Sequence, residues 1–121
     1  MVQKIGSKKE HDRIVNEILL ILGREAHHVC RAFNNPTGQA YRDHDWGREY
    51  IRYGVEGSGD IYGFTLNGRL FYIEVKSGNA KQQGNQARFQ EMCRKFCVAY
   101  FLCRTSQDAL TQVLRLAASS N

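Results

Sequence analysis

Apolar residues in the first quarter of the chain recur at the spacing of an α-helix. Four aliphatic side chains share one stripe of this expected helix: Ile14, Ile18, Ile21 and Leu22. Ser7 and Glu10 form a capping-box pattern directly ahead of the run, and Gly23 follows it. We therefore expect an amphipathic helix that begins near Ser7 and ends near Gly23.

A change to two-residue alternation in the middle of the chain predicts a β-hairpin. Asn67-Gly68 lies between the apolar runs 60–66 and 69–76, and Asn-Gly between such runs is the strongest short hairpin signal. Successive side chains of a strand point to opposite faces, so Glu74 and Lys76 must share a face. The pattern therefore predicts a carboxylate and an ammonium group close together on this hairpin.

The register of the hairpin decides whether Asp60 joins them. A strict two-residue loop places Asp60 on the face away from Glu74. A three-residue loop through Arg69, or a bulge near Gly63, moves Asp60 opposite Lys76 and onto the face of Glu74. We expect one of these irregularities, because without it the three charged side chains do not meet.

The rest of the chain completes a mixed α/β order. Four further elements are expected: a strand at about 28–33, a helix at about 85–96, a strand at about 98–103 and a helix from about 105 to 116. The order αβββαβα predicts a single domain over residues 1–121, in which helices flank a mixed β-sheet.

Residues 34–57 are the least regular part of the chain, and we expect a long loop there. Aromatic and basic residues alternate within it: Tyr41, Arg42, Trp46, Arg48, Tyr50, Arg52 and Tyr53. Such a mixture can stack on bases and hold phosphates. The rings can equally cover the edge of the core, and the sequence leaves both interpretations open.

Charge and composition favour a polyanionic partner. The formal net charge is +5 and the isoelectric point is near 9.2. Residues 61–121 carry all of that excess. No twenty-residue apolar run or signal-peptide pattern is present, which argues against a membrane protein. The four cysteines show no CxxC spacing, so we expect a reducing cytoplasm.

The charged residues of the hairpin indicate a chemistry. Asp60 and Glu74 supply carboxylate oxygens, which suit Mg²⁺ or Mn²⁺. Lys76 supplies a compact positive charge that can hold a metal-bound water or stabilise charge on a phosphate. Together they form a minimal site for cutting a phosphodiester. The alternatives are an exposed charge pair for Glu74 and Lys76, and an ordinary turn residue for Asp60.

These residues resemble the core of the PD-(D/E)XK nuclease superfamily. Over residues 8–116 the chain is similar to the VRR-NUC branch, which includes stand-alone phage proteins. The supporting motifs, in order, are a Glu10-led helix with Ile14 and Ile18, Arg31 near Asn34, Gly57-Ser58-Gly59-Asp60-Ile61, Ile73-Glu74-Val75-Lys76, Gln86 with Phe89, and Arg104-Thr105-Ser106 before the last helix. One departure is Gly59, where the superfamily name has proline.

The resemblance implies a restriction-endonuclease-like fold and a role for each matching residue. Asp60 and Glu74 would ligate the metal, Mg²⁺ or Mn²⁺, and Val75 would add its backbone carbonyl. Glu10 would reach the site from the first helix, in competition with Asp12 and Glu17 and with its capping role. Lys76 would orient or activate the attacking water, and Gln86 would support Lys76 or a phosphate unless it is simply solvated. Candidate DNA phosphate contacts are Lys8, Lys9, Arg31, Lys81 and Arg88.

The expected function is metal-dependent, structure-selective DNA cleavage. Stand-alone members of this branch are similar to Holliday junction resolvases, which act as homodimers on four-way junctions. We therefore expect a homodimeric resolvase, in the cytoplasm of a bacterial host if the chain is phage-encoded. The alternatives are a flap or fork nuclease and a catalytically silent DNA-binding module.

Overall fold

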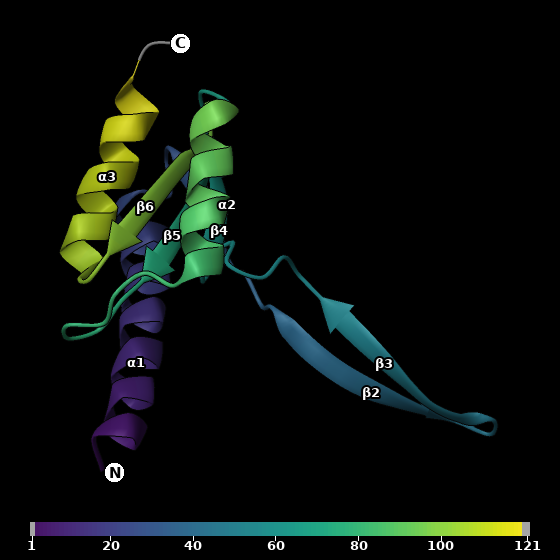
Figure 1. Cartoon of the computed structure of the whole chain (residues 1–121). Helices are drawn as coiled ribbons and strands as arrows, with labels where there is room; N and C mark the ends of the chain where they lie inside the picture. Colours follow the sequence, from purple (N-terminus) through teal and green to yellow (C-terminus); the bar gives the residue numbers. More distant parts are fainter. Residues whose placement is uncertain (1, 120–121) are drawn as a thin grey trace.

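The structure is a computed structural model that describes the backbone of residues 2–119 and the side chains of residues 8–119. Its central sheet has the order β1-β4-β5-β6 (Figure 1). Those strands span Cys30–Asn34, Ile61–Thr65, Leu70–Val75 and Ala99–Cys103. The first three pair antiparallel, and β6 runs parallel to β5. The expected mixed α/β sheet is confirmed.

Helices cover both faces of this sheet (Figure 1). Helices α1 (Val2–Glu25) and α3 (Ser106–Ala118) pack on one face, and α2 (Gly84–Lys95) packs on the other. On the first face the core contains fully buried side chains from each layer, namely Ile18, Leu22, Phe71, Ile73 and Val113. On the second face Phe89 of α2 contacts Tyr72 and Tyr100. None of the described helices is long and apolar enough to cross a membrane.

The first helix extends beyond both of its expected ends. It begins at Val2, so Ser7 lies inside the helix and is not its N-cap. No proline interrupts residues 2–6, and backbone hydrogen bonds carry the helix past the capping pattern. At the other end it passes through Gly23, because Leu22 and Ala26 are both buried against the sheet. That burial outweighs the cost of about 1 kcal/mol for a helical glycine.

The expected loop at 34–57 is wrong, because most of it forms a second sheet. Strands β2 (Gly38–His44) and β3 (Gly47–Tyr53) pair antiparallel around a two-residue turn. This hairpin projects from the body of the molecule (Figure 1). Tyr41 is 62% exposed and Trp46 is 74% exposed, so the rings do not cover the core. Neither face of the hairpin is buried, and the apolar–polar alternation of a half-buried strand is therefore absent.

The β4–β5 hairpin has the irregularity that its charged residues need. Ile61 pairs with Ile73, and four residues lie between the two strands. The last of them, Arg69, bonds to Thr65, which leaves a three-residue loop from Leu66 to Gly68. The backbone N–H of Thr65 donates to the carbonyl of Arg69 at 2.9 Å, and so closes the loop. The extra residue is thus Leu66, whereas the sequence suggested Arg69. This register places Asp60 opposite Glu74 instead of opposite Lys76, and on the same face of the sheet.

Candidate functional site

Three charged side chains meet at one end of the β4–β5 hairpin. Asp60 directly precedes β4, Glu74 is the penultimate residue of β5, and Lys76 directly follows that strand. The Oε2 atom of Glu74 lies 3.6 Å from Nζ of Lys76, and these side chains are only 6% and 10% exposed. The Oδ2 atom of Asp60 accepts a hydrogen bond from the backbone N–H of Val75 at 2.8 Å. The exposed-pair alternative for Glu74 and Lys76 is therefore wrong, since both are buried.

The surroundings of the Glu74 carboxylate disfavour its negative charge. Burial of Glu74 disfavours its charged form, and the neighbouring charge of Asp60 does the same; together they raise the pKa of Glu74 to about 7. Lys76 and His11 act in the opposite direction without cancelling that effect. A site that holds two acids with too little positive charge gains stability when a cation enters it.

The hydrogen bonds to the two carboxylates use one oxygen of each. Within the described residues they reach Oδ2 of Asp60 and Oε2 of Glu74. No group of three or more His, Cys, Asp or Glu side chains in the described part of the chain is arranged to hold a metal. Two carboxylate oxygens nevertheless fit a hard cation that keeps several waters, as Mg²⁺ does.

Gln86 completes the surroundings of Glu74. Its Nε2 donates to Oε2 of Glu74 at 2.9 Å. Its Oε1 accepts the backbone N–H of Gln83 at 2.7 Å in the first turn of α2. This second bond fixes the amide orientation, so the NH₂ group must point at the carboxylate. Gln86 thus orients Glu74, whereas the sequence suggested support for Lys76 or a phosphate.

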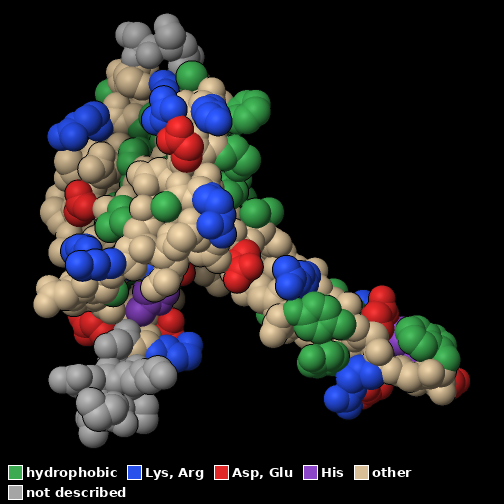
Figure 2. Space-filling view, viewed as in Figure 1, with side chains coloured by type: hydrophobic (Ala, Val, Ile, Leu, Met, Phe, Trp, Pro, Cys, Tyr) green, Lys and Arg blue, Asp and Glu red, His purple; other side chains and the backbone are tan. Residues whose placement is uncertain are grey.

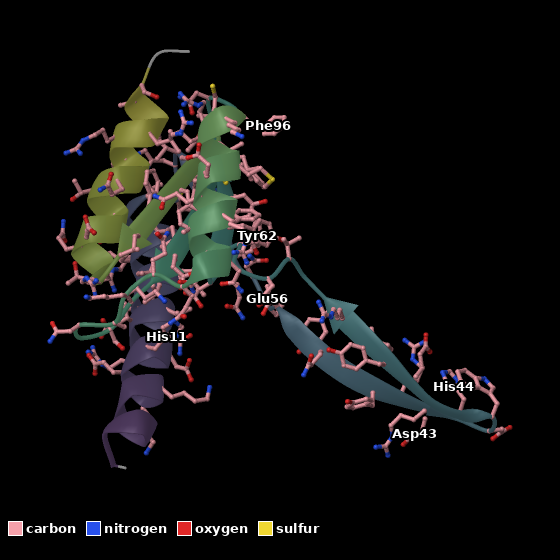
Figure 3. The ribbon with its side chains drawn as sticks, in the orientation of Figure 1. His11, Asp43, His44, Glu56, Tyr62 and Phe96 are labelled. Atoms are coloured by element: carbon pink, nitrogen blue, oxygen red, sulfur yellow. The ribbon has the colours of Figure 1, made fainter. Side chains whose placement is uncertain are left out.

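The first helix presents His11 to the site. The Nε2 atom of His11 lies 3.2 Å from Oδ2 of Asp60 (Figure 3 labels His11 on α1). Glu10 instead pairs with Arg13 on the same helix, and its side chain is 46% exposed. No hydrogen bond or ion pair joins Glu10 to Asp60 or Glu74 in the described structure. Glu10 therefore interacts with its own helix and not with the carboxylates of the site.

Sequence reasoning missed His11 although a signal was present. His11 lies three residues before Ile14 and seven before Ile18, which is as regular a helical spacing as that of Glu10. The sequence favours Glu10 because of its carboxylate chemistry and the resemblance. The two side chains differ by about 100° around the helix. Only the packing of α1 against the sheet decides which of them faces Asp60.

The loop that delivers Asp60 is held by polar contacts. The side-chain amide of Asn35 donates to Oγ of Ser58 at 2.9 Å and to the carbonyl of Gly59 at 3.1 Å. The hydroxyl of Tyr100 donates to the carbonyl of Gly57 at 3.2 Å. Ser58 itself is 3% exposed. The body of the protein therefore orders the loop that precedes Asp60.

Gly59 explains the departure from a proline at this position. Its φ angle is +102°, a conformation that proline, with φ fixed near −65°, does not reach. A Cβ atom at this position would lie 2.8 Å from the carbonyl oxygen of Ile73. The backbone must make this close approach because the N–H of Asp60 donates to that same carbonyl. The glycine is thus required by the pairing that brings Asp60 to Glu74.

We expect Gly59→Ala to destabilise the protein by about 2 kcal/mol, since it forces an unfavourable φ and a steric clash. Urea unfolding followed by circular dichroism measures the change. Gly23→Ala is the matched control, because Gly23 is helical and has nothing within 4 Å of an added Cβ. That control should be neutral or stabilising by up to about 1 kcal/mol. Equal stability of Gly59→Ala and the wild type would contradict the close approach.

The candidate phosphate contacts fall into two groups. Lys8, Lys9, Lys81 and Arg88 are exposed, the first two on α1 and the others in and before α2. Lys8 also lies 3.6 Å from Asp12. Arg31 is different, because it is paired with Phe64 toward the far end of β4, and it donates to the backbone carbonyls of His27 and Cys30. The structure does not bring Arg31 to the acidic site.

Comparisons of this chain with known protein families, with curated proteins and with solved structures found no match. The fold and the site define its class by themselves. The chain is a mixed α/β protein in which a buried glutamate, an aspartate and a buried lysine meet at one end of a hairpin.

Proposed function

We propose that this protein is a metal-dependent endonuclease that hydrolyses phosphodiester bonds in DNA, and that it is related to the VRR-NUC branch of the PD-(D/E)XK nucleases. The observation that carries the proposal is the buried Glu74, held beside Asp60 and Lys76 with a raised pKa. Burial of an acid next to another acid is costly for folding. Such an arrangement is typical of a site that binds a cation.

The proposed cofactor is Mg²⁺ or Mn²⁺, held by Asp60, Glu74 and the backbone carbonyl of Val75. When bound, such an ion polarises the phosphate and lowers the pKa of a bound water. Gln86 keeps the Glu74 carboxylate oriented through its 2.9 Å hydrogen bond. Lys76 supplies a positive charge next to the reacting phosphate, where it can position a water or stabilise the developing negative charge.

The proposed substrate is branched DNA, in particular a four-way junction, and the proposed active form is a homodimer. A chain with one such site needs a second copy to cut two strands at one branch point. The net charge of +5 suits DNA. An apolar surface suits a second copy, since Phe33, Phe64, Leu70, Met92 and Phe96 are all at least 40% exposed. Figure 2 shows hydrophobic side chains along this edge of the body, above the hairpin.

Cleavage of labelled DNA tests the proposal. Four-way junction, flap, fork, single-stranded and linear duplex DNA are incubated with Mg²⁺, Mn²⁺ or EDTA. We expect paired, metal-dependent nicks in the junction, and light scattering should report a dimer. Preferred cutting of flaps or forks would replace the resolvase assignment with that of a flap or fork nuclease. Binding without cutting under every metal would overturn the enzyme proposal and leave a DNA-binding module.

A further inference from the structure

The β2–β3 hairpin, here called the arm (Gly38–Tyr53), extends from the body next to the candidate site. Asn35 precedes the arm, and its backbone N–H donates to the carbonyl of Asp60 at 2.8 Å. The strand β4 begins at Ile61, eight residues after the arm ends. A polymer bound at Asp60 therefore lies close to the base of the arm (Figure 1).

One face of the arm carries a regular ladder of polar and aromatic side chains. Residues paired across antiparallel strands share a face, and so do alternate residues along each strand. Three successive cross-strand pairs define this ladder face: Gln39 with Arg52, Tyr41 with Tyr50, and Asp43 with Arg48. Every member carries a hydrogen-bonding group at its end. Gln, Arg and Asp are the residue types that recognise base edges in the major groove.

The two tyrosine rings are partly occupied by neighbours within the arm. Their centroids lie 5.4 Å apart in an edge-to-face contact. The guanidinium of Arg48 lies 5.5 Å from the centroid of Tyr41, and that of Arg52 lies 6.0 Å from the centroid of Tyr50. The rings thus support the arginines. A guanidinium that already lies over each ring competes with a stacked base, so the ladder suits groove recognition of a duplex better than stacking of single-stranded bases.

The charged side chains of the arm are unevenly distributed along its length. Asp43 is paired with Arg48 at 2.9 Å, and Glu49 with His44 at 2.8 Å. Arg52 is the one charged residue of the half next to the body, and within the described residues it has no acidic partner within 4 Å. Arg42 and Asp45 lie in the outer half together with the two ion pairs. Figure 3 labels Asp43 and His44 toward the outer end of the arm. The half of the arm closest to the candidate site is therefore its positive half, which suits a phosphate backbone.

A second copy of the chain is a poorer occupant of this face. The centre of a stable protein–protein interface is depleted of charged residues and apolar. The ladder face is polar at all three levels, and Figure 2 shows basic, acidic and hydrophobic side chains interspersed along the arm. The continuous apolar side chains lie on the body instead.

We propose that the ladder face of the arm binds duplex DNA, with the two-stranded ribbon lying in the major groove next to the phosphodiester that is cut. A groove about 12 Å wide admits a ribbon of this kind. The inference rests on the proposed function, since it extends the DNA contact of the same site. It assigns to the arm the recognition of the duplex that flanks the branch point.

Two charge reversals on opposite faces of the arm test this inference. Arg52→Glu changes the ladder face. Arg42→Glu makes the same charge change on the other face, where Arg42 lies opposite Glu49 in the strand register. Binding of the full-length variants to a fluorescent 30-base-pair duplex is measured by anisotropy in EDTA. We expect Arg52→Glu to weaken binding by about 10-fold or more and Arg42→Glu by less than about 3-fold.

Equal losses in the two variants, or none in either, would overturn the inference. So would unchanged binding together with a change in oligomeric state by light scattering, which would make the arm a contact between copies. Cleavage by the wild type separates this result from the proposed function. If the wild type binds duplex through Arg52 but never cuts DNA, DNA binding by the arm is supported and the nuclease proposal is overturned. If the wild type cuts DNA while Arg52→Glu binds normally, the nuclease proposal is supported and DNA binding by the arm is overturned.

Discussion

Glu74→Gln is expected to lower the rate of metal-dependent DNA cleavage by about 1,000-fold or more. An amide has almost the same shape as the carboxylate, but it lacks the negative charge that a divalent cation requires. Glu74 is buried and is oriented by Gln86. No cluster of three or more acidic, histidine or cysteine side chains that could hold a metal ion occurs in the described residues, so apart from Asp60 we expect no carboxylate to take over the role of Glu74. Rates on a four-way junction in Mg²⁺ and in Mn²⁺ measure the loss.

Glu91→Gln is the matched control for this experiment. Glu91 is an exposed residue of α2 that pairs with Arg94. Its replacement removes one negative charge from the same side of the sheet without touching the site, so the rate should stay within about 2-fold of the wild type. Retention of more than about a tenth of the wild-type rate by Glu74→Gln would show that this residue does not hold the metal.

The metal-free protein is expected to lose stability as the pH rises from about 4.5 to about 7. The pKa of Glu74 is about 7 in the folded chain and 4.5 in its ordinary state. Between these values the folded state holds a proton that the unfolded state has released, so the free energy of unfolding falls with rising pH. The full stabilisation is present below pH 4.5 and is lost above pH 7. The expected change is about 3 kcal/mol.

Urea unfolding in EDTA at a series of pH values measures this loss. Glu74→Gln should remove it, because an amide does not titrate, and the variant should be the more stable protein at pH 8. That result would also show that its loss of cleavage does not come from unfolding. Parallel pH profiles for the wild type and Glu74→Gln would contradict the raised pKa.

Local patterns in the sequence were enough to predict the heart of the site. The two-residue period of a strand makes Glu74 and Lys76 share a face in any register. The need for Asp60 to join them predicted an irregular hairpin, and the structure has one. The choice of loop residue was wrong, because Thr65 closes the loop on Arg69 and so excludes Leu66 from the strand pair.

The arm could not be predicted from apolar periodicity. In a sequence, a strand is recognised by the alternation of apolar and polar residues, which arises when one face of the strand is buried. Neither face of the arm is buried. The cross-strand ladder of tyrosines and arginines depends on the strand register, which places Tyr41 opposite Tyr50. In the sequence the same residues are an irregular mixture of aromatic and charged side chains.

The sequence by itself determined the order of helices and strands of the body, the mixed sheet, and the shared face of Glu74 and Lys76. These features depend on short-range geometry, which repeats every two or 3.6 residues. Only the tertiary structure decided that His11, and not Glu10, faces Asp60, because the rotation of α1 is set by burial of Ile14 and Ile18 against the sheet. It also decided that Glu74 is buried next to a second acid, since that proximity depends on strand pairing between distant residues.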